Sequence, residues 1–247
     1  MTVGTALTMH AAQHQPFTWF QLFPPLASME TQYGSHVLSA ILVTALVSVF
    51  GLVAVMQTRR RASTVVPEKT VTTGNLFEMI SEALYGFCES VLGEHEAAIY
   101  FPFVASLFLF VFCSNFLGLI PGFLPPTDNM NTTLAIGAFV FLFYNFQGVK
   151  AHGIGYLKHF LGPVLWLAPL MFVIELITHV MRPLSLALRL RGNIMGDHVV
   201  LHVFTDLVPY LVPVIFYGMG VFVSFIQAFV FCLLTMVYIS MATAHDH

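Results

Sequence analysis

A run of apolar residues without a single Asp, Glu, Lys or Arg, His36–Gln57, constrains the fold of this chain more than any other feature. A helix needs about 20 such residues to cross the hydrocarbon core of a bilayer. Apolar stretches of this length or longer recur along the chain, and only 9% of its 247 residues are charged. Because a helix satisfies its own backbone hydrogen bonds in lipid, the sequence predicts an all-α integral membrane protein.

We predict five crossings. Three are expected at about 37–57, 98–120 and 132–149, and two more lie within the longer apolar segments 162–204 and 209–241. A helix over 162–204 would be about 64 Å long, roughly twice the thickness of the hydrocarbon core, which is about 30 Å. We therefore expect the last two segments to form a long, steeply tilted helical hairpin, with Pro183 as the position for any kink.

The segment 74–93 has a different pattern. Its apolar residues recur at helical spacing and form one stripe: Leu76, Phe77, Ile80, Leu84, Phe87, Val91 and Leu92. Three glutamates interrupt this stripe, which indicates an amphipathic helix on the cytoplasmic membrane surface. The segment 120–129 holds three prolines within six residues and is predicted to be an external loop.

The placement of positive charge predicts the orientation. Of nine Lys and Arg, those outside the spans fall within 59–69 and 150–158, so these segments are expected on the cytoplasmic side. The N-terminus is then outside and, after five crossings, the C-terminus is cytoplasmic. We divide the chain into an external segment (1–35), a first span with the amphipathic helix (36–97) and a core of four spans (98–247). The net charge of −3 argues against a nucleic-acid partner, and the spacing of the three cysteines indicates packing residues.

Arg189 lies inside the fourth apolar segment, where a permanently charged guanidinium is costly and marks an ion path or a partner's charge. Polar and small residues recur there in alternating steps of three and four, which places them on one helical face: Glu175, Thr178, Arg182, Ser185, Arg189, Gly192 and Gly196. This face must contact protein or water. The small residues beside Arg189 would let another helix approach closely.

No residue of the chain is placed to neutralise Arg189. Glu175 is about 21 Å away along a helix and Asp197 about 12 Å, so a carboxylate from another subunit is the simplest counter-ion. A second polar row, His198, His202 and Thr205 or Asp206, lies toward the external end. The last segment has a polar stripe of its own, which we expect to face that of the fourth: Tyr210, Tyr217, Gly220, Ser224 and Gln227.

Three motifs resemble the a subunit of F-type ATP synthase, and the resemblance covers nearly the whole chain. The strongest lies in 184–193 and contains Arg189, the second lies in 115–121 with 125–127, and the third lies in 227–242. Three motifs in the family's order make the resemblance specific. It implies a non-catalytic, proton-translocating stator subunit of a bacterial inner membrane, in contact with a rotating ring of c subunits and with peripheral-stalk b subunits.

The resemblance also implies site residues. Arg189 matches the family's essential arginine, which separates two offset half-channels that lead protons to and from the ring carboxyls. The proton path is predicted to include Glu175, Asn193, His198, His202, Asp206, Ser224 and Gln227. The first three and Gln227 match family positions, and the others come from the polar rows. No cofactor and no metal are predicted.

The chain departs from the family at several positions. Arg191 replaces a usual aromatic residue, His198 replaces a common acid, and Gly220 stands where some members have His or Glu. The usual acid–histidine relay is therefore incomplete, and we expect His202 or Asp206 to supply the missing group.

Other readings stay open at this point. Glu175 could form a structural ion pair with Arg182 or His179, and His198, His202 and Asp206 could bind a metal. A secondary transporter would usually show an internal repeat, and none is visible in the sequence.

Overall fold

The computed structural model describes residues 17–59, 73–153, 155–156, 168–207 and 212–243. These residues form seven α-helices and two short 3₁₀-helices: η1 (Trp19–Leu22), α2 (Pro24–Tyr33), α3 (Ser35–Arg59), α4 (Thr73–Leu92), α5 (Glu94–Leu117), η2 (Pro126–Asp128), α6 (Met130–His152), α8 (Ala168–Leu207) and α9 (Val212–Thr243). The described part of the chain contains no strand, so the predicted all-α class is confirmed.

Among the helices of the described residues, five are long and apolar enough to cross a membrane, as predicted. They are α3, α5, α6, α8 and α9. The second crossing begins earlier than predicted because Gly93, at φ +84°, ends α4 and lets a new helix start at Glu94. Glu94 and Glu96 lie in the first turn of α5, where negative charge favours the helix N-terminus.

The predicted amphipathic helix is α4, which is not among the five spanning candidates. Its apolar side packs against α5 and α9, with Leu84 and Cys88 buried in the main core and Phe87 stacked on Phe229 at 4.3 Å between ring centroids. Glu82 and Glu89 are exposed. Protein therefore covers most of the apolar stripe.

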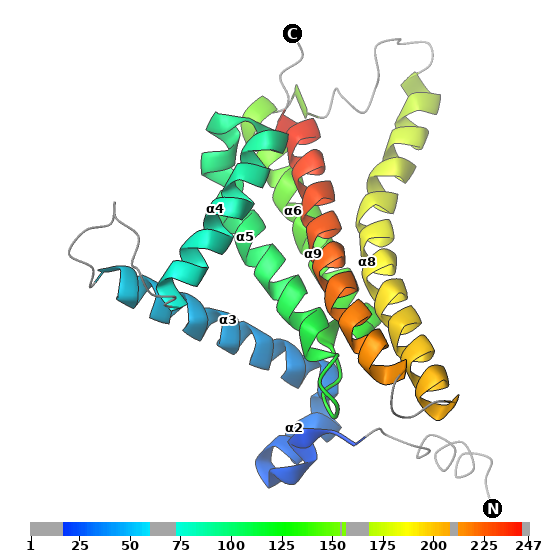
Figure 1. The fold of residues 1–247 in the computed structure, drawn as a ribbon. Helices are drawn as coiled ribbons and strands as arrows, with labels where there is room; N and C mark the ends of the chain where they lie inside the picture. Colours follow the sequence, from blue (N-terminus) through cyan, green and yellow to red (C-terminus); the bar gives the residue numbers. More distant parts are fainter. Residues whose placement is uncertain (1–16, 60–72, 154, 157–167, 208–211, 244–247) are drawn as a thin grey trace, which may run out of the picture.

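The helices α5, α6 and α9 lie together, α8 lies beside them, and α3 runs across at a steep angle (Figure 1). Buried aliphatic and aromatic side chains fill the core between them, among them Val104, Val111, Val140, Tyr144, Leu190 and Phe231. The backbones of α6 and α8 approach closely at Gly137, where an added Cβ would lie 2.8 Å from the carbonyl oxygen of Pro183. Only glycine allows the two backbones to approach this closely.

The geometry of α8 and α9 agrees with a steeply tilted hairpin. Helix α8 continues through Pro183 for 40 residues, so any kink there does not interrupt it. Its spanning stretch, Pro169–Leu201, has 33 residues. That length is about 50 Å, well over the thickness of a hydrocarbon core of about 30 Å, so the helix must tilt or extend beyond the core. Because α3 crosses α8 and α9 at a large angle in Figure 1, these helices cannot all follow the membrane normal.

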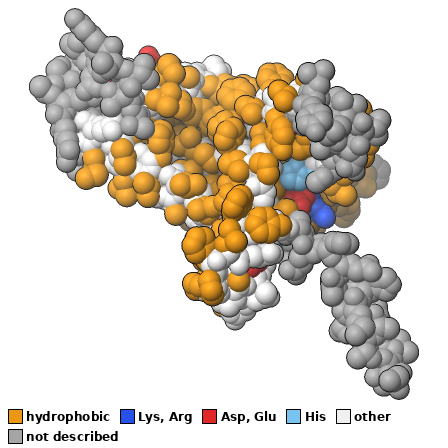
Figure 2. All heavy atoms as spheres, turned by 60° about the horizontal axis from the view of Figure 1, so that its bottom comes forward, with side chains coloured by type: hydrophobic (Ala, Val, Ile, Leu, Met, Phe, Trp, Pro, Cys, Tyr) orange, Lys and Arg blue, Asp and Glu red, His pale blue; other side chains and the backbone are white. Residues whose placement is uncertain are grey.

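Large hydrophobic side chains remain exposed on several helices. They include Ile41, Leu52, Phe139, Phe146, Ile177 and Phe222. Hydrophobic side chains also cover much of the described part of the face in Figure 2, with few charged groups among them. Such a surface suits contact with lipid or with other membrane subunits.

The N-terminal part of the described chain holds the loop between α5 and α6. The Trp19 indole donates a hydrogen bond to the carbonyl oxygen of Pro121 at 2.8 Å, and its backbone N–H donates to Gly122 at 3.2 Å. At the other end of the loop, the Thr127 hydroxyl donates to Asn115 Oδ1 at 2.9 Å, and both residues are buried. The loop is therefore fixed beside the C-terminal end of α5.

Candidate functional site

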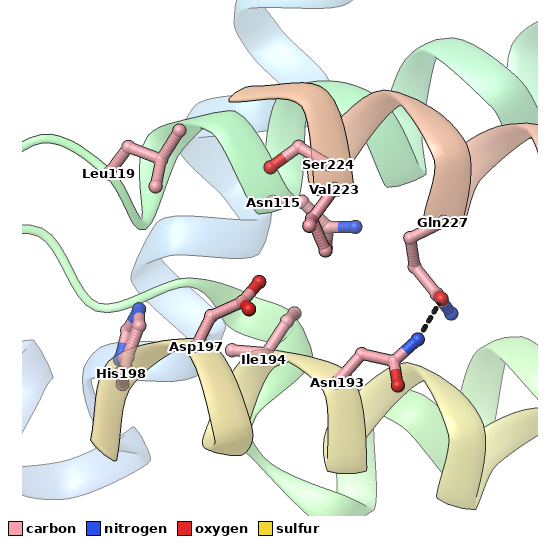
Figure 3. A pocket seen from close by; sticks show the side chains of 9 residues that line it. All are labelled: Asn115, Leu119, Asn193, Ile194, Asp197, His198, Val223, Ser224 and Gln227. Atoms are coloured by element: carbon pink, nitrogen blue, oxygen red, sulfur yellow. Dashed lines mark hydrogen bonds between the residues drawn. The ribbon is translucent and has the colours of Figure 1, made fainter. Parts of the chain in front are cut away.

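A polar pocket lies where the C-terminal end of α5 meets α8 and α9 (Figure 3). Its cavity volume is about 20 Å³, which leaves room for about one water molecule. Its lining comes from three parts of the chain: Asn115 and Leu119; Asn193, Ile194, Asp197 and His198; and Val223, Ser224 and Gln227. Of the predicted site residues, Asn193, His198, Ser224 and Gln227 thus lie together, although they come from two helices.

Asn193 and Gln227 join the two helices across this pocket. The Asn193 side-chain amide donates a hydrogen bond to Gln227 Oε1, as Figure 3 shows. Gln227 is only 3% exposed, and its amide nitrogen has no hydrogen-bond partner among the described residues. A buried amide without a partner is costly unless water or a ligand reaches it.

Asp197 also lines the pocket, and the sequence interpretation did not include it among the site residues. Its carboxylate points from α8 into the space between α8 and α9, and His198 follows it on the same helix (Figure 3). The distance from Arg189 had excluded Asp197 as a counter-ion. The sequence could have indicated Asp197 as a site residue, because it follows Asn193 by four residues and such a spacing places two side chains on one side of a helix.

Arg189 lies on the open side of α8. Its side chain is exposed and forms no ion pair with any described residue. A Cβ added at Gly192 or Gly196 would meet nothing within 4 Å. The buried side of α8 is a different one, formed by Leu186, Leu190 and Ile194.

This arrangement corrects one expectation. The stripe that contains Arg189 was predicted to face the polar stripe of the last segment, but Arg189 and the two glycines are exposed. The residues of α8 that meet Ser224 and Gln227 are Asn193 and Asp197 instead. The reason is geometric, since Asn193 lies about 40° around the helix from Arg189 and Asp197 about 80°.

A second polar cluster lies near the opposite end of α8. Glu175 and Arg182 form an ion pair at 3.7 Å, as the structural alternative for Glu175 proposed. His179 is buried and its Nε2 lies 2.8 Å from Asn145 Oδ1 on α6, to which the Tyr156 hydroxyl also donates at 3.1 Å. Burial raises the pKa of the Tyr156 phenol, so this hydroxyl stays protonated and can donate.

Arg191 and the loop residues have defined structural roles. The Arg191 Nε donates to the backbone carbonyl of Asp128 at 3.2 Å, which joins α8 to η2. Asn129, the next residue, caps α6, because its side chain accepts a hydrogen bond from the backbone N–H of Asn131 at 2.9 Å.

His202 and Asp206 lie in α8, but their side chains are outside the described residues, as is Tyr210 altogether. Their predicted role in the proton path and the metal alternative that includes them are therefore not tested. Among the residues that the structure does describe, no three His, Cys, Asp or Glu side chains converge as metal ligands would.

The profile of one protein family, described as ATP synthase A chain, matches residues 37–240. The chain belongs to this family. It is similar to ATP synthase subunit a of Bdellovibrio bacteriovorus, with 49% identity over 94% of this chain and 99% of that protein. It is also similar to ATP synthase subunit a of Geobacter sulfurreducens and to subunit a 3 of Pelobacter propionicus. These are 53% and 54% identical, each over 72% of this chain and 79% of the relative.

Membership of the ATP synthase A chain family makes the chain a subunit of the proton-translocating membrane sector of ATP synthase, and a multi-pass bacterial membrane protein. At Gly220, an added Cβ would lie 2.6 Å from Leu119 Cδ2, so a larger side chain at this position would displace the Leu119 side chain in the wall of the pocket.

Proposed function

We infer that the chain is the non-catalytic stator subunit that leads protons through two offset half-channels to and from the carboxyls of a rotating c-ring. Arg189 would separate the two half-channels. The observation that carries this proposal is an exposed guanidinium without an ion pair among the described residues. An unpaired Arg at the centre of a membrane helix costs about 2.5–3.5 kcal/mol by insertion scales, so a partner's carboxylate at this face is favoured.

The surface around Arg189 suits such a partner. Gly192 and Gly196 leave open space on the same side of α8. Small residues of this kind let the backbone of another helix approach closely, which is how helices pack in membranes. A helix of the c-ring, with its carboxyl opposite Arg189, fits this face. The peripheral-stalk b subunits are proposed as the second partner.

The two polar clusters are proposed as parts of the two half-channels. The pocket with Asn193, His198, Ser224 and Gln227 would lead from the external side, and His202 and Asp206 would extend it. Glu175 would belong to the cytoplasmic half-channel. This assignment follows from the orientation proposed above, with the N-terminus outside and the C-terminus cytoplasmic.

Arg189→Ala in the complete ATP synthase tests the proposal. We expect loss of ATP-driven proton pumping in membrane vesicles and a raised passive leak once the catalytic sector is removed, because Arg189 no longer separates the half-channels. Arg191→Ala is the matched control, since it removes the same group two residues away and only a hydrogen bond to the loop. Normal coupled pumping by the Arg189→Ala complex would refute the proposed function.

Gly192→Phe tests the contact with the ring. The chain has room for this side chain, because nothing lies within 4 Å of the added Cβ. The variant chain should therefore fold and insert normally but fail to bind the c-ring. Recovery of a normal amount of c-ring with this variant would contradict the proposed interface.

A further inference from the structure

We propose that Asp197 is the group that carries protons through the external pocket, an inference that depends on the function proposed above. Asp197 supplies the one carboxylate among the described residues that line this pocket. It forms no hydrogen bond or ion pair with any described residue, and it points into the open space (Figure 3). A carboxylate that no neighbour holds is free to bind and release a proton.

Asp197 and Arg189 lie on the same helix, α8, with Asn193 midway between them. Asp197, Asn193 and Arg189 are spaced by four residues, which is a rise of about 6 Å for each step along the helix. Each step also turns about 40° around α8, from the pocket to the open side. A proton leaving Asp197 thus reaches the Asn193–Gln227 pair first and the face that carries Arg189 next.

The rest of the pocket is suited to water. Asn115, Ser224 and Gln227 are all less than 10% exposed, yet they present polar side chains to the same space. The Gln227 amide nitrogen has no hydrogen-bond partner among the described residues. Ordered water in such a site forms two to four hydrogen bonds with polar groups and can relay protons between them.

Proton transfer through Asp197 breaks and forms only bonds to the proton that moves. An O–H bond of a hydronium ion in the pocket breaks as an O–H bond forms on Asp197, which leaves a water molecule and a neutral carboxylic acid. The O–H bond then breaks when the proton passes on toward the ring carboxylate. His198 is the other titratable group of the pocket lining, and Arg191, also on α8, is held by the loop carbonyl of Asp128.

Asp197→Asn in the complete ATP synthase tests this inference. Asn has nearly the same shape and hydrogen-bonding capacity but cannot carry a proton. ATP-driven pumping per assembled complex should fall by at least ~10-fold, because a positioned acid–base group typically contributes 10²–10⁴-fold. Asp197→Glu, which keeps a carboxyl in the pocket, should retain most of the activity even if Asn at this position impairs assembly.

Asp128→Asn is the matched control. It makes the same chemical change in the neighbouring loop, outside the pocket lining, and should pump like the wild type. Pumping by Asp197→Asn at the rate of this control would overturn the role of Asp197. The role of Asp197 would also be overturned if Asp197→Asn and Asp197→Glu lost pumping activity equally while assembly stayed normal. That pattern indicates a purely structural residue.

The result for Arg189→Ala separates the two proposals. If Arg189→Ala abolishes pumping while Asp197→Asn does not, the proposed function holds and the inference on Asp197 fails. If neither substitution affects pumping, the proposed function itself fails.

Discussion

Gly137→Ala should destabilise the chain, because it adds a methyl group where the backbones of α6 and α8 approach closely. The new Cβ would lie 2.8 Å from the carbonyl oxygen of Pro183. This oxygen belongs to the backbone of a long helix and cannot rotate away, so the two helices must separate. Such overpacking typically costs about 1–3 kcal/mol.

Gly51→Ala is the control, because it lies in another spanning helix and its Cβ would meet nothing within 4 Å. Both substitutions gain about 1 kcal/mol of helix propensity, so the difference between the two variants isolates the contact with Pro183. At about 2–4 °C for each kcal/mol, Gly137→Ala should melt measurably below Gly51→Ala.

Thermal unfolding of the detergent-solubilised chain can be followed with a thiol-reactive fluorophore. Cys88 and Cys232 are both 0% exposed and will react only as the core opens. The partly exposed Cys113 is first replaced by Ala to remove its background. Equal melting temperatures for the two glycine variants would show that the close approach of α6 and α8 does not limit stability.

Two further predictions use the detergent-solubilised chain for melting and alkylation, and the complete ATP synthase for pumping. Glu175→Gln removes the ion pair with Arg182, whose charged atoms lie 3.7 Å apart. Because the Glu175 side chain is 36% exposed, the free energy of unfolding should change by less than about 1 kcal/mol. A large loss of pumping with little change in melting would then support the proton path, and the reverse pattern would support a structural ion pair. Burial raises the pKa of Cys88 to about 11, so at pH 8 its thiol is protonated and alkylation should be slow, rising as the pH approaches 11. Rapid alkylation of the folded chain at pH 8 would contradict the packing of α4 on the core.

Much of the fold could be predicted from apolar length alone. The lengths of the segments gave five spans and a tilted final hairpin, and the helical spacing of the apolar residues gave α4. These features follow from local rules on hydrogen bonding in lipid and on helix periodicity. The absence of an ion partner for Arg189 among the described residues also agrees with the spacing of its nearest acids.

The arrangement of the pocket could not be predicted in this way. A stripe in steps of three and four selects one face of a helix, but α8 uses a neighbouring face to meet α9. Asp197 was therefore overlooked, and the polar stripe of α9 was paired with the stripe of Arg189 instead of with Asn193 and Asp197. The bond from Arg191 to the Asp128 carbonyl joins residues that are 63 positions apart, which no local pattern encodes.

The slant of α8 has one more consequence. A 33-residue stretch, about 50 Å long, that crosses a core about 30 Å thick at a slant has its two ends displaced sideways from each other. In the proposed function, the two half-channels would therefore open at different points along the face of the c-ring. A ring carboxyl that is loaded at one opening would have to move laterally before it could discharge at the other.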